Sequence, residues 1–361
     1  MRRIGVLVSL SVAALVAVTG CSSSGGGGSS SGSSSSGSAT RAVVVVSGGG
    51  AVSPFTTPTE ACTSGLAAGN TDTALREYLL GQGKQVFTAP ANMVPGVVTE
   101  PDPSSFGAFG DCPPALPANM TITSTEDIDL SGERLTRFLG YLNETYGISE
   151  VDLVGHSNGG LYSRAAIRDL KDSGSPITVT SLTTLGTPHQ GNVPSRYATG
   201  EITLAEACQG DAACEDFDRK WKKYARGAAV SMENTQSYLD GPQGWNARQK
   251  GVLDGIPVTL LAGSYFMNEK GAAEDPDIWP FDGIVSKYSG LAEGLPDSVI
   301  PHRTCWSAPL THSIFVSDVA KLDWQTALTW NTDSLARVNA AIDGSATALE
   351  QPNRQGCPAA P

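Results

Sequence analysis

The stretch that decides the fold is Val151–Gly160, which reads VDLVGHSNGG. Its first half is an apolar run typical of a buried strand, and after Gly155 and Ser157 it continues with helical spacing. A glycine two residues before Ser157, and Gly159 two residues after it, leave room for a sharp strand-to-helix turn. Such a turn exposes a serine Oγ to a base and aims the next N–H at a substrate. The pattern predicts Ser157 as a nucleophile; the alternative is a purely structural glycine-rich turn.

Predicted strands and helices alternate on both sides of this stretch. Runs rich in β-branched residues indicate strands, and apolar residues three to four apart indicate helices. The expected strands are Ala42–Val46, Gln85–Ala89, Val151–Val154, Ile177–Leu185, Pro257–Ala262 and Ser298–Arg303. Besides the helix after Ser157, the expected helices are Thr73–Leu80, Leu130–Tyr146, Ile314–Leu328 and Asp333–Ile342. This alternation predicts an α/β fold in residues 41–361, with a mostly parallel central sheet and helices on both faces.

A polar insertion separates two of the expected strands. Residues 192–250 contain many turn formers and a charged stretch with helical character, Cys208–Tyr224. An insertion at this point of an α/β fold is typical of a lid over the active site. The alternative is a surface excursion without a gating role.

The N-terminal residues predict export. Arg2 and Arg3 precede an apolar run, Ile4–Val18, as in a signal peptide. The small residues before Cys21 resemble a bacterial lipobox, in which the cysteine is acylated and becomes the mature N-terminus. Residues 1–21 are therefore predicted to be a lipoprotein signal peptide; the alternative is an ordinary signal peptide with an incidental cysteine.

The next segment, residues 22–40, is almost purely serine and glycine and is predicted to be a flexible tether. No later apolar stretch is long enough to span a bilayer. We therefore expect a cell-envelope lipoprotein, anchored to the outer face of the membrane through its N-terminal lipid, with release to the extracellular space as the alternative.

Six cysteines follow Cys21, and an even number in an exported chain favours disulfides. Six cysteines allow about 15 pairings. The preferred pairing joins cysteines that share a local segment: Cys62 with Cys112, Cys208 with Cys214, and Cys305 with Cys357. Metal binding is the weaker interpretation, because neither paired CxxC spacing nor clustered histidines occur.

The charge balance bears on one class of partner. The formal net charge is −12 and the isoelectric point is about 4.8. An acidic chain of this kind lacks the positive surface that binds phosphate backbones, so we expect no nucleic-acid partner.

A serine nucleophile needs a base, and the chain has four histidines. His156 adjoins Ser157 and is expected to point away from Oγ into the packing. His189 follows a strand and is expected to shape a turn, and His302 falls within a predicted strand. His312 follows that strand in a loop, which makes it the best candidate for the general base.

The base needs a carboxylate to fix its tautomer and to stabilise its charged form. Asp282 lies after the strand Pro257–Ala262 and before the histidine loop, so the order Ser157, Asp282, His312 matches the α/β-hydrolase arrangement. Competing carboxylates are Asp275 and Asp277, which lie in a proline-punctuated loop.

Charge that develops on a substrate oxygen needs donors already in place. One is expected to be the backbone N–H of Asn158, directly after the nucleophile. The other is expected in the glycine turn that follows Ser47, with Gly49 as the choice. The alternative is that these glycines only make a tight turn.

These segments together resemble bacterial α/β-hydrolase lipases and esterases, here in an exported lipoprotein form. The matching segments are Val43–Gly50, Gly155–Gly159, GTPHQG at Gly186–Gly191, DGIV at Asp282–Val285 and LTHS at Leu310–Ser313. They extend over most of the domain.

The chain departs from such lipases at two places. Ser47-Gly48 stands where they usually carry His-Gly, and the insertion is less apolar than an interfacial lid. Some related lipases hold a structural calcium, for which Glu274, Asp275 and Asp277 offer oxygens. A solvated acidic loop is the preferred interpretation, so we expect no metal and no cofactor.

The resemblance implies a serine carboxylic-ester hydrolase, a lipase or an esterase, that cleaves acyl esters or lipids through a Ser-His-Asp triad and an acyl-enzyme intermediate. An envelope acyltransferase or thioesterase with the same triad is one alternative. A non-catalytic lipid-binding lipoprotein is another, although a binding module does not need Ser157, Asp282 and His312 in this order.

Overall fold

A computed structural model describes residues 40–63, 65–69, 71–100, 109–212, 214–216, 219, 231–349 and 354–357. The predicted signal peptide with Cys21, and the predicted tether up to residue 39, lie outside the described residues. None of the helices in the described ranges is both long and apolar enough to cross a membrane.

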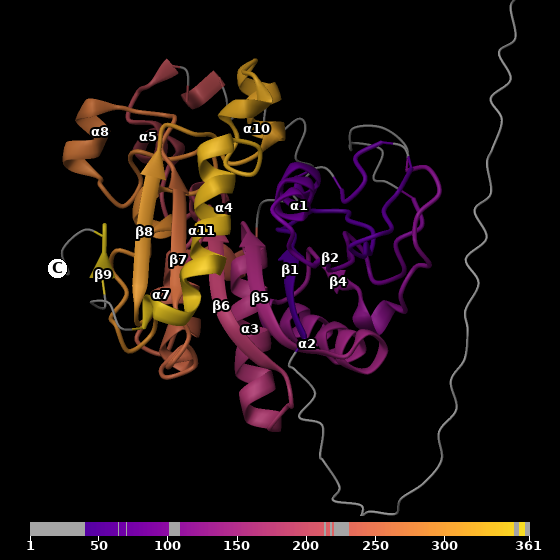
Figure 1. Ribbon diagram of the computed structural model, residues 1–361. Helices are drawn as coiled ribbons and strands as arrows, with labels where there is room; N and C mark the ends of the chain where they lie inside the picture. The colour runs from indigo at the N-terminus through magenta and orange to yellow at the C-terminus, as the bar shows by residue number, and fades with distance from the viewer. Residues whose placement is uncertain are drawn as a thin grey trace, which may run out of the picture. The chain divides into compact units, whose positions relative to one another are not determined.

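A seven-stranded sheet forms the centre of the fold (Figure 1). Its order is β2-β1-β5-β6-β7-β8-β9, and every neighbouring pair is parallel. This confirms the predicted parallel sheet. The edge strand β9 was not expected from the sequence. The strands are β1 (Thr40–Val46), β2 (Val86–Thr88), β5 (Ile148–His156), β6 (Thr178–Leu185), β7 (Val258–Gly263), β8 (Arg303–Ala308) and β9 (Arg354–Gln355).

Four helices cover the two faces of the sheet: α1 (Asp72–Gly81), α2 (Ile128–Tyr146), α3 (Asn158–Ser173) and α11 (Thr332–Ala348). Because side chains alternate along a strand, β1 serves both faces. Val44 and Val46 pack in the same cluster as the apolar residues of α2 and α3, whereas Val43 and Val45 pack with those of α1 and α11. The buried run of β-branched residues thus makes β1 a central strand with a layer of helices on each side.

The remaining elements are short. They are β3 (Ala91–Asn92), β4 (Ile122–Thr123), α4 (Val193–Ala198), α5 (Leu204–Cys208), α7 (Gln236–Asp240), α8 (Glu269–Glu274), α9 (Lys287–Gly290), α10 (Ile314–Ala320) and the 3₁₀ turns η1 (Ala118–Met120), η2 (Met232–Asn234), η3 (Trp245–Gln249) and η4 (Trp324–Thr326).

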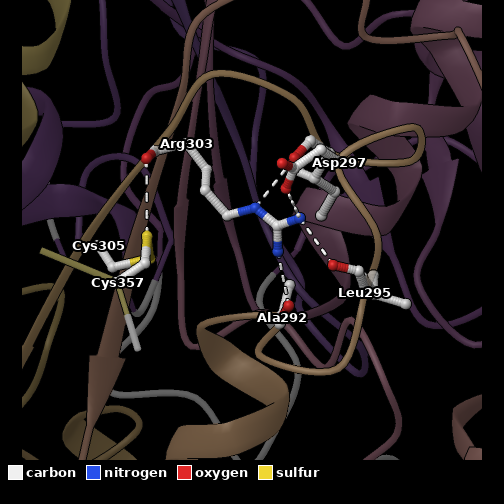
Figure 2. The surroundings of a disulfide bond; sticks show 7 residues. Ala292, Leu295, Asp297, Arg303, Cys305 and Cys357 are labelled. Carbon is white, nitrogen blue, oxygen red and sulfur yellow. Dashed lines mark hydrogen bonds and ion pairs between the residues drawn. A yellow bond between two sulfur atoms is a disulfide. The ribbon is translucent and has the colours of Figure 1, made fainter. Parts of the chain in front are cut away.

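The strand predicted at Ser298–Arg303 is wrong, because β8 begins where that segment ends. Pro301 has no N–H for a ladder, and His302 has a left-handed backbone with φ 44°. The preceding loop instead wraps the buried side chain of Arg303, whose guanidinium donates to the carbonyl oxygens of Ala292 (2.6 Å) and Leu295 (2.8 Å), as Figure 2 shows.

Two predicted helices also end early. The stretch Cys208–Tyr224 does not continue as one helix, because α5 ends at Cys208 and Gln209 has φ 51°. Part of that stretch lies outside the described residues. The helix expected at Ile314–Leu328 ends at Ala320, because Lys321 takes the left-handed backbone that commonly ends a helix.

The second half of the insertion packs onto the body of the domain. Trp245 is fully buried and its indole donates to Asp129 at 2.7 Å. Asn246 donates to the carbonyl of His189 at 2.8 Å, and Glu233 accepts from the N–H of Ile128 at 2.6 Å. Residues 231–250 are therefore tied to α2 and to the segment after β6 by specific hydrogen bonds.

All three predicted disulfides are present: Cys62–Cys112, Cys208–Cys214 and Cys305–Cys357. The last of them joins β8 to the residue that follows β9 by two positions, and so fixes the edge of the sheet (Figure 2). Disulfides of this kind persist in oxidising surroundings and are rare in the cytosol. They indicate a protein that works outside the cytoplasm.

Candidate active site

The centre of the site is the turn between β5 and α3. Ser157 lies between these elements with φ 53° and ψ −131°, a backbone conformation that is rare for a residue with a side chain. Its N–H donates to the carbonyl of Leu185 at 2.9 Å, which fixes the turn to the neighbouring strand β6. The local sequence thus forms the strained strand-to-helix turn that it predicts.

Two glycines around this turn are required by close backbone contacts. A Cβ on Gly159 would lie 2.2 Å from the carbonyl oxygen of Val46, at the end of β1. A Cβ on Gly48 would lie 2.4 Å from the Cβ of Ser157. Both distances are far below van der Waals contact, so only glycine fits. The glycine turn after β1 therefore lies directly against Ser157.

His312 and Asp282 meet beside this turn. The Nδ1 of His312 lies 2.8 Å from Oδ2 of Asp282, and the backbone N–H of His312 donates to the carbonyl of Asp282 at 2.9 Å. The other carboxylate oxygen accepts from the N–H groups of Ile284 (2.9 Å) and Val285 (2.7 Å). Asp282 is 1% exposed. Each oxygen of this carboxylate is thus held by specific donors, which fixes the orientation of the imidazole.

One pocket brings the sequence-predicted residues together. It encloses about 560 Å³ of empty space, including its opening to solvent. Its lining is mostly glycine and polar residues: Gly48, Gly49, Gly50, Ala51, Thr71, His156, Ser157, Asn158, Asn192, Asn234, Ile284, His312, Ser313 and Phe315. Ser157, His312 and the two residues with the expected amide donors line the same space, whereas Asp282 lies behind His312.

Among the described residues, the hydrogen bonds of the glycine turn leave the N–H groups of Gly48 and Gly49 without a partner. The N–H of Gly50 donates to Ser124 at 3.1 Å, and that of Ala51 to Gly48 at 3.3 Å. Within the described part of the chain, the N–H groups of Gly49 and Asn158 have no hydrogen-bond partner. These are the two donors that the sequence predicts for an oxyanion. Their catalytic role stays a prediction.

His156 makes a contact that the sequence did not reveal. It is buried as expected, but its Nε2 lies 2.9 Å from the carbonyl oxygen of His312, and the two rings are 4.8 Å apart. Burial, and then the nearby His312, lowers the pKa of His156 to about 3. A neutral ring with its proton on Nε2 donates to that carbonyl and supports the loop that carries His312. No local pattern predicts such a contact between residues 156 positions apart.

His189 lies away from the pocket lining and is fully buried. Its Nδ1 lies 3.3 Å from the guanidinium of Arg164, and its Nε2 lies 3.2 Å from the hydroxyl of Thr184. Burial lowers the pKa of His189, and the Arg164 guanidinium adds to that effect. Both ring nitrogens are occupied, which agrees with the expected role in shaping the turn.

The competing carboxylates of the acidic loop have other partners. Asp277 pairs with Arg196 at 3.0 Å, and Asp275 accepts from the amide of Gln209. Across the ranges that the structure describes, no group of three or more histidine, cysteine, aspartate or glutamate residues is arranged to hold a metal ion. The expectation of no cofactor remains a prediction.

Comparison with known proteins agrees with this architecture. A family model described as "Alpha/beta hydrolase of unknown function (DUF915)" matches residues 119–230, which include the turn at Ser157. No curated protein matches the sequence. The parallel sheet, the turn after β5, and the histidine loop after β8 give the chain the α/β-hydrolase fold.

Several solved structures are similar at low identity. The mature Bacillus licheniformis lipase BlEst2 has 13% identity and a TM-score of 0.46, with 85% of this chain and 92% of that chain covered. The product of lin2722 from Listeria innocua has 15% identity and a TM-score of 0.44, with 88% and 98% covered. A Pyrobaculum calidifontis esterase has 12% identity and a TM-score of 0.40, with 86% and 78% covered.

Proposed function

We propose that this protein is a serine carboxylic-ester hydrolase that cleaves acyl esters through an acyl-enzyme intermediate. The observation that carries the proposal is the hydrogen bond between His312 and Asp282 beside a pocket in which Ser157 occupies a strained turn. A nucleophile, an oriented base and unpartnered amides in one pocket are the parts that acyl transfer needs.

In the first half of the reaction, Nε2 of His312 takes the proton from Oγ of Ser157 as that oxygen attacks the ester carbonyl. Asp282 stabilises the imidazolium through Nδ1. The N–H groups of Gly49 and Asn158 donate to the oxyanion of the tetrahedral intermediate. When the intermediate collapses, the bond to the alcohol breaks and His312 gives its proton to the leaving oxygen.

In the second half, a water molecule attacks the acyl carbonyl of the ester on Ser157. His312 takes a proton from this water, and the same two amides hold the second oxyanion. The acid leaves when the bond to Oγ breaks and His312 returns the proton to Ser157. The enzyme is then in its starting state, and the net reaction consumes one water per ester.

The pocket lining favours short acyl groups. Among the described residues that line it, Ile284 and Phe315 are the only apolar side chains larger than alanine. A long alkyl chain needs an extended apolar surface, because each methylene left in water forgoes about 0.8 kcal/mol. We therefore propose an esterase with a preference for short chains over a lipase for long-chain lipid.

The proposed place of action is the outer face of the cell membrane. The disulfides support a site outside the cytoplasm, and the sequence before Cys21 supports acylation at that cysteine. Radiolabelled palmitate should enter the full-length chain in bacterial cells, whereas the Cys21→Ser variant should take up none. Equal labelling of both chains would refute the anchor.

The main test is hydrolysis of p-nitrophenyl esters from acetate to palmitate by the domain that begins at Thr40. Ser157→Ala should abolish turnover, and Ser173→Ala, an exposed serine at the far end of α3, should leave it unchanged. A fluorophosphonate should label the wild type and not Ser157→Ala. Folded protein without Ser157-dependent turnover would refute the proposal, and products formed with added alcohols would favour an acyltransferase.

A further inference from the structure

A second buried carboxylate lies behind the glycine turn. Asp72 is the first residue of α1 and is fully buried. Its Oδ2 accepts hydrogen bonds from the hydroxyls of Ser47 and of Ser53, the latter at 3.1 Å. The two serine hydroxyls also lie 2.6 Å apart. A carboxylate and two hydroxyls thus form a closed buried cluster, called here the Asp72 cluster.

The Asp72 cluster holds both ends of the segment that contains the glycine turn, Gly48–Gly50. Ser47 directly precedes Gly48, and Ser53 closes the segment by pairing with Ala91, whose carbonyl accepts from Ser53 N–H at 2.9 Å. Gly48 lies so close to Ser157 that a Cβ on Gly48 would be 2.4 Å from the Cβ of Ser157. A movement of Ser47 would therefore shift the amide of Gly49 relative to the nucleophile.

Helix capping does not account for Asp72. The N-cap of α1 is Thr71, and no side chain makes a capping hydrogen bond there. Thr71 donates instead to Oδ1 of Asp72, at 3.4 Å, and itself lines the pocket. The carboxylate therefore points toward the turn, and the residue before it forms part of the pocket wall.

A contribution to the stability of the fold does not explain the buried Asp72 either. Burial raises the pKa of Asp72 to about 6, although the hydrogen bonds from Ser47, Ser53 and Thr71 oppose this. No lysine or arginine of the described residues forms an ion pair with it. Burying a carboxylate without a cation costs free energy, so Asp72 is not explained as a residue that stabilises the fold.

We propose that Asp72 is a positioning residue that holds the Gly48–Gly50 turn against Ser157, so that the Gly49 amide meets the oxyanion. This inference rests on the proposed ester hydrolysis. Because the donor acts on charge that develops in the transition state, loss of the cluster lowers kcat and leaves KM nearly unchanged.

The test compares Asp72→Ala, Asp72→Asn and Ser47→Ala in the hydrolysis of p-nitrophenyl butyrate by the domain that begins at Thr40. Losing one oxyanion donor costs on the order of 10²–10³-fold in kcat. We expect Asp72→Ala to lose about tenfold to 100-fold in kcat with KM within about threefold, because the donor is displaced and not removed. Asp72→Asn keeps an acceptor oxygen and should recover part of the loss.

Asp152→Asn is the matched control. Asp152 is also buried and also accepts from a hydroxyl, that of Thr180 at 2.9 Å, but it lies in β5 away from the pocket lining and pairs with Arg41. This control should lower the melting temperature and keep kcat within about twofold. It separates a general effect of losing a buried carboxylate from an effect on the turn.

The outcomes separate the two proposals. An active wild type with folded Asp72→Ala at full kcat, or with a change in KM alone, overturns the positioning role and leaves ester hydrolysis standing. If Asp72→Ala does not fold, unchanged kcat in both Asp72→Asn and Ser47→Ala overturns it in the same way. A wild type without Ser157-dependent turnover overturns both.

Discussion

Replacing Asp282 by asparagine should exchange donor and acceptor in the hydrogen bond with Nδ1 of His312, while the side chain keeps nearly the same shape. The Oδ1 of Asp282 accepts from the N–H groups of Ile284 and Val285, at 2.9 and 2.7 Å. Asparagine must keep its oxygen at that position, because an NH₂ group there would face two donors. Its NH₂ group then replaces Oδ2, the atom that lies 2.8 Å from Nδ1 of His312.

A donor at that place forces Nδ1 to act as an acceptor. The imidazole then carries its proton on Nε2 and cannot take the proton of Ser157. Inversion of the tautomer in a Ser-His-Asp triad costs about 10⁴-fold in kcat. At about 1.4 kcal/mol per factor of ten, this is about 5.5 kcal/mol of lost transition-state stabilisation.

The fold should tolerate the change, because the amide keeps the two backbone donors and one contact to the imidazole. We expect the free energy of unfolding to change by about 1 kcal/mol, which shifts the melting temperature by about 2–4 °C in a domain of this size. The loss of activity is therefore far larger than the loss of stability, and the two are measured on the same sample.

The assay is the kcat for p-nitrophenyl butyrate, with thermal melting monitored by circular dichroism. The control is Asp277→Asn, which removes a competing carboxylate that pairs with Arg196 at 3.0 Å and should leave kcat unchanged. If Asp282→Asn melts normally and keeps kcat within about tenfold of the wild type, the assigned role of Asp282 is wrong. A large loss in Asp277→Asn instead would transfer that role to Asp277.

Three further predictions follow from the same geometry. Gly186 has φ 57°, and a Cβ there would lie 2.9 Å from Nδ1 of His312. Gly186→Ala should therefore lower kcat by about 100-fold or more but reduce the free energy of unfolding by only about 1–2 kcal/mol, as measured by kinetics and urea denaturation. Full activity of this variant would contradict the prediction. His156→Phe removes a donor to the His312 carbonyl, so the variant should lose about tenfold in kcat. Because the pKa of His156 is about 3, the pH profile of kcat above pH 5 should keep its shape. A shifted profile would show that His156 titrates in the reaction. Burial raises the pKa of Asp72 from 3.8 to about 6, so the folded chain binds this proton more tightly than the unfolded chain. The wild type should therefore lose about 2.4 kcal/mol of unfolding free energy between pH 4 and 7 that Asp72→Asn does not lose, and parallel stability curves would refute this.

The strand-to-helix turn at Ser157 was predictable because its signal is local. Steric contacts require glycine at position 159, and the apolar run before Ser157 lies in the buried part of β5, which ends at His156. The same holds for the pairing of Cys208 with Cys214, which are 6 residues apart. Short-range constraints of this kind leave residue types at fixed spacing, and sequence patterns detect them.

Strand β8 was predicted too early in the chain, because Val299 and Ile300 are β-branched and apolar, yet they are buried in the loop before the strand. Arg303 opens β8 and is buried, although arginine is rarely buried without partners. Its partners are carbonyl groups of the preceding loop, such as Ala292 and Leu295, and backbone carbonyls leave no trace in the amino-acid types. An error in one strand boundary therefore came from a tertiary interaction that periodicity does not encode.

The Asp72 cluster could not be predicted from the sequence, because it too depends on tertiary contacts. It also contributes to the geometry of the site. Ser47 and Asp72 are 25 residues apart, at the end of β1 and the start of α1, and they meet only because α1 packs beside β1. The sheet thus fixes Ser157 through β5, and we propose that the layer containing α1 fixes the Gly48–Gly50 turn through the buried carboxylate of Asp72. Residues 231–250 are also hydrogen-bonded to the body of the domain. We therefore propose that the catalytic geometry comes from a preformed pocket more than from the closure of a lid.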